Sequence, residues 1–504
     1  VELQAGDKLH VTAGAEVLEL AVPPLDTVAF VQSDRITGRT APDVPVTLMV
    51  ADSPLFFDTT VETRSDAAGN FSHDFSGKRN IRHGDFIQVT AEIGGHKVSD
   101  LTVAPGLLMD LDQAVLLGSI APNLDVTVTL RRGASNLSRQ STRTDADGAM
   151  FVRFADAQGQ PLRLQVGDVV TVAASDPTQD PLSLTVPDLA LSWDIAADTV
   201  SGSAPAQGQL TVFAGTVYPL ADTLGIAQGW PTVQAGNRFS TEFVPSIDVR
   251  PGSRFTLLYR PPQGHYVVRS RTVPILNAEH SGPKACGFGT PYEPVSAKLE
   301  LGGRQLAAAA AQPAPFDGFF SRLLLDAAGK AVKTAAGQRE SAQLGGPSAA
   351  IDLPDFEMVV DWNSQQVSGK GPGGSTYYVQ PASPCEAQRP GGILNFGGAF
   401  AQDERTEADG SFATFLPAGA APGSGVEIAF YAADGQRYFR QAYRALARIY
   451  IHSDRVTGQA NPLDEATVIL KGAAGQERSR ATAAANGDGA FGLLFERGGA
   501  SVPE

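Results

Sequence analysis

The sequence predicts an all-β protein, and three observations support that fold class. The 504 residues include 53 glycines and 34 prolines, which indicate many turns and few long helices. No helical periodicity is sustained, and even the alanine-rich stretch 301–312 is expected to form a strand and a loop. Three short signatures recur along the chain, and each is typical of a turn beside an alternating strand.

The first signature is a β-branched or apolar residue, a short residue and then a glycine, as in "DRITGRTAPDVPVTLMV" and "TVSGSAPAQGQLTVF". The glycines lie 80 to 89 residues apart, at Gly38, Gly118, Gly202, Gly287, Gly369 and Gly458. This spacing predicts one module of about that length for each glycine.

The second signature is a turn followed by alternating apolar residues, as in "SDAAGNFSHDF" and "TDADGAMFVRF", and it occurs six times. Glycine accepts the positive φ of such a turn, and aspartate bonds back to the local backbone. Residues four apart, such as Phe71 and Phe75, then lie on one face of a strand.

The third signature is a glycine, often followed by aspartate, before an alternating strand, as in "IRHGDFIQVTA" and "LQVGDVVTVAA". Gly337 is a weak example. The opening "LQAGDKLHVTA" matches this signature well, whereas the last module contains only the first two signatures. The order of the signatures therefore predicts a module that is split between the two ends of the chain.

About seven short strands per module is the pattern of an immunoglobulin-like sandwich, so we expect a linear rod of such modules. The split module would contribute its C-terminal strands at 1–26 and its incomplete remainder at 446–504. The fourth module is divergent, and the fifth carries an insert at 380–398. The five full modules are expected at 27–106, 107–189, 190–274, 275–355 and 356–445.

The V-x-G opening at Val200 to Gly202, the turn from Asp145 to Phe151 and the strand from Gly167 to Val172 resemble tandem bacterial immunoglobulin-like repeats. There is some similarity to carboxypeptidase-regulatory-like sandwiches. The resemblance covers nearly the whole chain. It implies a stalk, spacer, adhesin arm or fibre subunit of an exported bacterial protein, extracellular or at the cell surface.

Composition and motifs argue against several other functions. A net charge of -15 without a lysine or arginine run disfavours nucleic-acid binding. The sequence contains no stretch of 18 apolar residues, so we expect no membrane span. No catalytic motif is present, so we expect neither an enzyme nor a cofactor or metal. Four turn carboxylates remain weak calcium candidates: Asp145, Asp147, Asp409 and Asp488. Cys286 and Cys385 are candidates for one disulfide in an oxidising exterior.

The split module predicts how copies of the chain would assemble, because an unpaired strand edge templates association. We expect a filament or stalk whose subunits join head to tail by strand complementation. The donor residues would be Leu3, Leu9, Val11, Val17, Leu18 and Leu20, and the acceptor residues Val468, Leu470, Phe491, Leu493 and Phe495.

Other arrangements and functions stay open at this point. The chain could be a piece of a longer covalent array, or the split could close within one chain to form a ring. An adhesin arm that binds a glycan or protein ligand through a divergent module, chiefly the fifth with its insert, is the alternative function. An accessory region of a secreted hydrolase comes third.

Overall fold

The protein is built from β-strands, and the all-β fold class is confirmed. Within the part of the chain that the structure describes, the one helical element is the short 3-10 helix η1 (Val31–Ser33), and no helix is long or apolar enough to cross a membrane. The computed structural model describes residues 5–13, 16–52, 57–156, 159, 162–176, 179–214, 227–244, 246–247, 249–313, 318–381, 402–416, 425–450, 455–471, 474–487, 489–495 and 501–503.

The strands from β3 to β37 repeat one arrangement, which we number as modules 1 to 5. The first, second and fifth strands of a module form one antiparallel sheet, and the fourth, third, sixth and seventh form the other, in that order. This is the strand arrangement of an immunoglobulin-like sandwich. In module 1 the seven strands are β3 (Asp26–Phe30), β4 (Arg35–Arg39), β5 (Pro45–Ala51), β6 (Thr59–Arg64), β7 (Asn70–Asp74), β8 (Phe86–Ile93) and β9 (His96–Val103).

The next two modules follow the same order. Module 2 consists of β10 (Gly106–Asp110), β11 (Val115–Ser119), β12 (Asp125–Arg132), β13 (Ser135–Arg143), β14 (Ala149–Arg153), β15 (Val169–Ala174) and β16 (Leu182–Thr185). Module 3 consists of β17 (Ala190–Asp194), β18 (Thr199–Ser203), β19 (Gln209–Ala214), β20 (Ala227–Gly229), β21 (Arg238–Thr241), β22 (Arg254–Arg260) and β23 (Tyr266–Thr272).

Modules 4 and 5 repeat it again, and the alanine-rich stretch is the end of one strand, a turn and the next strand, as expected. Module 4 consists of β24 (Ile275–Glu279), β25 (Lys284–Phe288), β26 (Pro294–Leu301), β27 (Arg304–Pro313), β28 (Phe319–Leu323), β29 (Arg339–Leu344) and β30 (Ser348–Asp352). Module 5 consists of β31 (Glu357–Asp361), β32 (Gln366–Lys370), β33 (Thr376–Pro381), β34 (Gln402–Arg405), β35 (Ser411–Phe415), β36 (Gly425–Tyr431) and β37 (Arg437–Tyr443).

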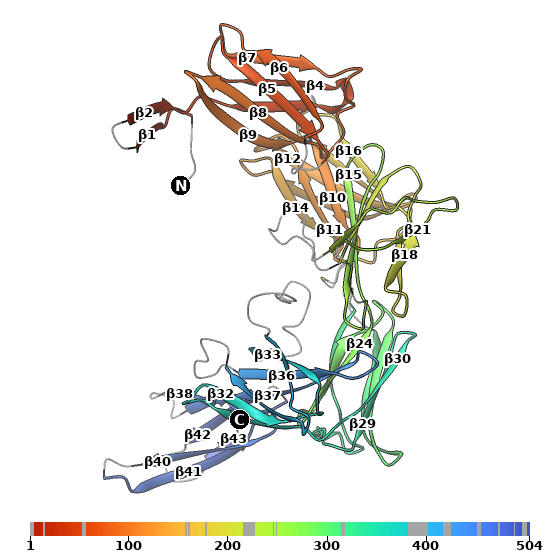
Figure 1. Ribbon diagram of the computed structural model, residues 1–504, viewed down its shortest axis with the longest axis vertical. Helices are drawn as coiled ribbons and strands as arrows, with labels where there is room; N and C mark the ends of the chain where they lie inside the picture. The colour runs from red at the N-terminus through yellow and green to blue at the C-terminus, as the bar shows by residue number, and fades with distance from the viewer. Residues whose placement is uncertain are drawn as a thin grey trace.

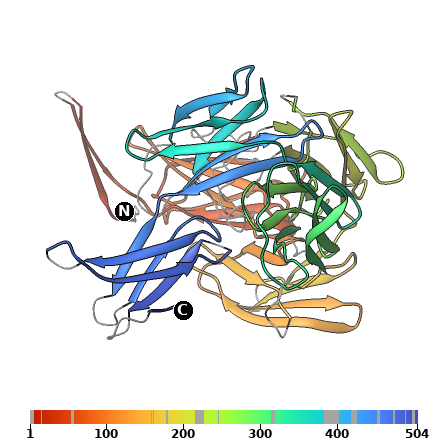
Figure 2. The ribbon, with the colours of Figure 1, turned by 90° about the horizontal axis from the view of Figure 1, so that it is seen from below.

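Two groups of strands lie outside this repeat. The hairpin of β1 (Lys8–Ala13) and β2 (Glu16–Ala21) projects away from the sandwiches in both views (Figures 1 and 2). We give the name module 6 to the group β38 (Leu446–Tyr450), β39 (Arg455–Gln459), β40 (Glu465–Lys471), β41 (Glu477–Ala484), β42 (Ala490–Phe495) and β43 (Ser501–Pro503).

The recurring glycine of the second strand makes room for the aromatic residue of the fifth strand. Gly38 lies opposite Phe71 in the sheet, and a Cβ atom on Gly38 would lie 2.2 Å from Phe71 Cζ. The same clash, at 2.4 Å, would occur between Gly458 and Phe491. The first and second signatures are therefore two sides of one contact, in which the ring lies across a strand that has no side chain at that position.

Neighbouring modules are joined in pairs, which the sequence did not predict. β10 of module 2 pairs in parallel with β23 of module 3, and β24 of module 4 pairs in parallel with β37 of module 5. Each pair of modules thereby shares one seven-stranded sheet and one hydrophobic core. The modules also follow a curved path rather than a straight rod (Figure 1).

Candidate assembly site

The hairpin β1–β2 has the sequence of the sixth and seventh strands of a module but lies outside any larger sheet of the described residues. Its strands pair only with each other, with Leu9 opposite Leu20 and Val11 opposite Leu18. The Gly-Asp signature places Val11 at the position of Val172 in module 2. Val172 is 1% exposed, whereas Val11 is 51% exposed. An apolar face that is core in a complete module is thus open to solvent in the hairpin.

Module 6 shows the complementary deficiency. Its third and fourth strands, β40 and β41, form a two-stranded sheet, and no sixth or seventh strand extends that sheet among the described residues. Leu470 of β40 is 50% exposed, whereas Leu130, at the same position of module 2, is fully buried. Among the described residues of this module, the core cluster contains three buried side chains, Ala481, Ala483 and Leu493.

The predicted donor and acceptor residues fall into four groups in the structure, the first of which contains the exposed Val11 and Leu470. Leu9, Leu20, Val468, Phe491 and Phe495 are half-buried, and only Leu493 is fully buried. Val17 and Leu18 lie in β2, but their side chains, like the whole of Leu3, are outside the described part of the chain.

The calcium candidates that the structure describes act in turns. Asp145 Oδ1 accepts the backbone N–H groups of Asp147 at 3.0 Å and Ala149 at 2.8 Å, and Asp409 Oδ1 accepts that of Ser411 at 2.9 Å. Asp488 lies outside the described residues. Among those described, no group of three or more metal-binding side chains is present.

The predicted disulfide and the insert are each described only in part. Cys286 is fully buried in β25 and is disulfide-bonded. Cys385 lies outside the described residues, so its pairing with Cys286 stays a prediction. The insert at 380–398 is described only for the backbone of its first two residues.

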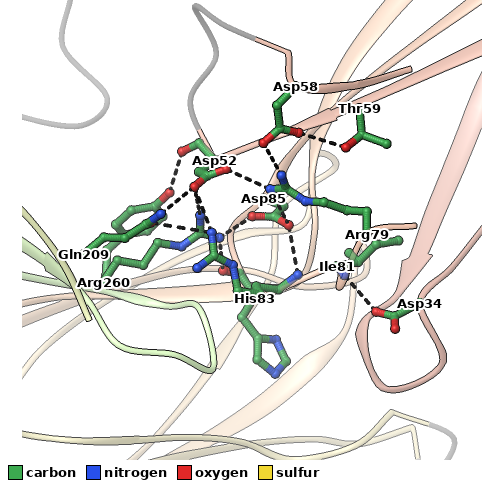
Figure 3. Close-up of polar contacts among 12 residues, drawn as sticks. Asp34, Asp52, Asp58, Thr59, Arg79, Ile81, His83, Asp85, Gln209 and Arg260 are labelled. Atoms are coloured by element: carbon green, nitrogen blue, oxygen red, sulfur yellow. Dashed lines mark hydrogen bonds and ion pairs between the residues drawn. The ribbon is translucent and has the colours of Figure 1, made fainter. Parts of the chain in front are cut away.

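A buried ionic cluster joins module 1 to module 3, and sequence reasoning missed it. The Asp85 carboxylate lies between the guanidinium groups of Arg79 and Arg260 (Figure 3), and both Asp85 and Arg260 are almost completely buried. Asp52 accepts a hydrogen bond from Arg79 at 2.8 Å and one from Gln209 of module 3 at 2.7 Å. These bonds fix module 1 against a module that is not its neighbour in the chain.

The charge balance in this cluster keeps the Asp52 carboxylate ionised. Burial alone would raise the pKa of Asp52, but hydrogen bonds from Arg79 and Gln209 and the charges of Arg79 and Arg82 lower this pKa well below its ordinary value. The carboxylate is therefore charged at neutral pH and pairs with the guanidinium groups around it.

A similar joint recurs between modules 3 and 5. This recurrence is the sequence signal from which the joint could have been predicted. The turn "RHGD" at 82–85 corresponds to "RPGS" at 250–253, and the loops that they contact contain Gly264 and Gly435. A Cβ on Gly264 would lie 2.3 Å from the carbonyl oxygen of His83, and one on Gly435 would lie 2.6 Å from Pro251 Cδ. Both glycines have positive φ. A comparison of these turns and loops reveals the joint, whereas the strand signatures do not.

A pair of stacked histidines makes the joint between modules 1 and 3 sensitive to acid. The rings of His83 and His265 lie 4.3 Å apart, and Nδ1 of His265 accepts the backbone N–H of Leu107 at 3.2 Å. Burial lowers the pKa of His265 to about 3, with His83 as a further cause. Because this pKa is below the ordinary 6.5 of an unfolded histidine, the stabilisation is present above pH 6.5 and is lost as the pH falls.

We expect His265→Gln to weaken this acid sensitivity. Glutamine is the residue at the equivalent position of module 5, where Gln436 Oε1 accepts the N–H of Leu276 at 2.7 Å. The melting temperature of the wild type should fall between pH 7.5 and pH 5 by several degrees more than that of the variant. Equal slopes for the two proteins would contradict the assignment.

Comparisons with known proteins do not assign the chain to a family. The chain matches no protein-family model and no curated protein. Among solved structures it is similar to a tetra-tandem repeat from the extending region of a large adhesion protein, with 14% identity and a TM-score of 0.14, over 84% of this chain and 98% of the other.

Two further structures have the same level of similarity. The BSP domain of a biofilm associated protein shares 9% identity at a TM-score of 0.14, over 84% of this chain and 95% of its own. A bacterial ice-binding adhesin shares 13% identity at a TM-score of 0.13, over 50% of this chain and 97% of its own. At these TM-scores the similarity says nothing about function.

Proposed function

We propose that the chain is a structural subunit of an extracellular filament or cell-surface stalk, assembled head to tail from copies of itself. In this assembly the hairpin β1–β2 of one copy supplies the sixth and seventh strands of module 6 in another copy. The observation that carries the proposal is the matched pair of open apolar faces, one on the hairpin around Val11 and one on module 6 around Leu470.

The complete modules supply the register of the proposed contact. In module 2 the third strand pairs with the sixth so that Val128 lies opposite Val172 and Leu130 opposite Val170. The equivalent pairs across copies are Val468 with Val11 and Leu470 with Leu9. Each partner in these pairs is apolar, so the hairpin fits module 6 without placing a charge in its core.

Two kinds of interaction would stabilise this contact between copies, namely the burial of apolar side chains and the formation of main-chain hydrogen bonds. Burying each apolar side chain contributes roughly 1.5–3 kcal/mol, and each new main-chain hydrogen bond contributes about 0.5–1.5 kcal/mol. Donor and acceptor are different surfaces of the chain, so the contact is heterologous and produces an open filament unless the rotation between copies closes a ring. A second strand pairing beside β40 also covers an exposed edge that would otherwise aggregate.

A double-cysteine variant tests the proposed register. His10 and Ile469 would lie opposite each other on the outer face, and both side chains are solvent-exposed. We expect His10→Cys with Ile469→Cys, after mild oxidation, to give a ladder of multiples of the 52.7 kDa chain on a non-reducing denaturing gel. The matched control Thr12→Cys with Ile469→Cys is offset by two residues and should give little cross-linking.

The other outcomes of this experiment decide between the alternatives. A band of monomer size with altered mobility would show closure within one chain, which would overturn the filament. Uncross-linked monomer, like that of the offset control, would overturn the strand exchange itself. If the cross-linked ladder forms, electron microscopy of the same material should show filaments with an axial repeat of about six modules. If the chain stays an uncross-linked monomer, it should show single curved rods.

A further inference from the structure

The chain contains two copies of one lateral junction. In each, the first strand of one module lies parallel to the seventh strand of the next, with Met109 opposite Val267 in the first copy and Ala278 opposite Tyr438 in the second. All four side chains are at most 4% exposed. The junction therefore buries the residues at the centre of the strand pair and joins two sandwiches into one unit.

Module 6 has the first half of this junction without the second. Its first strand, β38, lies at the edge of its sheet, and within the described part of the chain it pairs only with β39. Ile449 is the fourth residue of this five-residue strand, the position of Met109 in β10 and Ala278 in β24. Ile449 is 71% exposed, whereas Met109 and Ala278 are fully buried.

Module 1 has the second half. Its seventh strand, β9, also lies at a sheet edge. Val98 pairs with Ala91 of the sixth strand, just as Val267 pairs with Tyr259 in module 3 and Tyr438 with Phe430 in module 5. Val98 is half-buried, and Leu101 on the same strand is 52% exposed.

The segment before module 1 independently marks that module as the second member of a pair. Within the two observed pairs the modules are linked by "VPDL" at 186–189 and "LPDF" at 353–356, whose last residues, Leu189 and Phe356, are at most 1% exposed. The segment that links the hairpin to module 1 is "VPPL" at 22–25, and Leu25 packs against the core of module 1. Links between pairs have no large apolar residue directly before the first strand, where Pro105, Pro274 and Ala445 stand instead. The similar run "VPIL" at 273–276 lies two positions later, so that its last two residues belong to β24.

We propose that β38 of one copy pairs in parallel with β9 of the copy that donates the hairpin, and so forms a third seven-stranded sheet across the contact. The two observed junctions place Arg448 opposite Lys97, Ile449 opposite Val98 and Tyr450 opposite Ser99. Arg448 and Lys97 are both exposed in the single chain, and as like charges opposite each other they weaken the pairing at this one position. The proposal rests on the proposed function, because the donated hairpin is what brings module 1 of its own copy beside module 6.

One arrangement of two copies then covers the open faces of the hairpin and module 6 together with the edges β38 and β9. A module 6 completed by a hairpin is followed in the donor copy by module 1, as module 2 is followed by module 3 and module 4 by module 5. Along the chain, consecutive modules that share a sheet alternate with consecutive modules that do not. This alternation would continue from one copy to the next. The interface would include the hairpin, the open face of module 6 and the two edges β38 and β9.

A second double-cysteine variant of the full chain tests the lateral junction separately from the hairpin. Val98→Cys with Ile449→Cys should give an oligomer ladder after oxidation, like the His10 and Ile469 pair, whereas the control Val98→Cys with Ile469→Cys should not. If the His10 and Ile469 pair cross-links and the Val98 and Ile449 pair does not, the lateral junction is wrong and the strand exchange stands. If neither pair cross-links, both proposals are overturned.

A binding measurement covers the case in which a cysteine disturbs the edge. Ile449→Lys places a charge at an exposed position, so the fold of the free chain should be unchanged by circular dichroism. We expect the dissociation constant between copies, measured by analytical ultracentrifugation, to rise about ten- to hundredfold. An unchanged dissociation constant would overturn the lateral junction, and Val359→Lys, at an exposed position of β31 outside both proposed contacts, is the matched control.

Discussion

Asp85→Ala is expected to open the joint between modules 1 and 3. The substitution removes the nearer carboxylate of Arg260, which is 3% exposed, and leaves only Asp52, whose Oδ2 lies 4.0 Å from the Arg260 guanidinium. Removing one partner of a buried ion pair typically costs about 3–5 kcal/mol, because the remaining charge stays uncompensated. Separation of the two modules returns Arg260 to water, so the joint should open before either module unfolds.

Small-angle X-ray scattering measures this opening as an increase in the radius of gyration. Asp58→Ala is the matched control, since Asp58 also pairs with Arg79 but its side chain is 50% exposed. An exposed pair contributes about 0–1 kcal/mol, so this variant should keep the wild-type radius. If both variants scatter like the wild type, the cluster does not hold module 1 in place.

Glu340→Leu is expected to stabilise the unit of modules 4 and 5 at neutral pH. Glu340 lies in the core of module 4 and is completely buried, and neither carboxyl oxygen has a hydrogen-bond partner among the residues that the structure describes. The same position is Val170 in module 2 and Val426 in module 5, both buried. An unsatisfied buried polar group costs about 1–3 kcal/mol, and we expect leucine to recover an amount of that order.

The pH dependence gives this prediction a second readout. Burial raises the pKa of Glu340 well above its ordinary 4.5, and the charge of Glu279 adds to the effect. Because the folded protein holds this proton more tightly than the unfolded chain, stability is greatest below pH 4.5 and is lost as the pH rises through the folded pKa. Leucine and glutamine at this position should both abolish this loss.

Urea unfolding followed by the fluorescence of Trp362, which packs against the shared core of modules 4 and 5, measures the effect. Trp193→Phe and Trp230→Phe remove the other tryptophans of the chain. Glu340→Gln is the matched control, because it removes the charge but keeps an unsatisfied polar group. It should flatten the pH profile with little gain at low pH, and a destabilised Glu340→Leu would show that the carboxyl group has a partner after all.

Local patterns predicted the strands well because each pattern reports one contact within a module. The glycine at Gly38 and the aromatic at Phe71 recur together because they touch, and the turn aspartates recur because they bond to the next few backbone groups. Alternation in "ALSWD" at 190–194 correctly indicates a strand with one face open to solvent. The turn contacts join residues that are close together in the sequence. The glycine–aromatic contact is fixed by the register in which the second and fifth strands of a module pair.

The junctions between modules could not be predicted in the same way. The strand "ILNAE" at 275–279 is buried along its whole length, but Asn277 and Glu279 make it look like a strand with a polar face. Its burial comes from β37, more than 150 residues later in the chain. The open faces of the hairpin and module 6 were predictable from the order of the signatures, whereas their pairing remains a proposal.

The parallel strand pairs at the shared sheets have a consequence for mechanical load. The chain enters a pair of modules through the start of β10 and leaves it through the end of β23, and the two strands point the same way. Tension on the two ends therefore pulls the strands past each other along their length. The ladder bonds lie across the direction of pull and must rupture together, so each pair resists stretching as a single element.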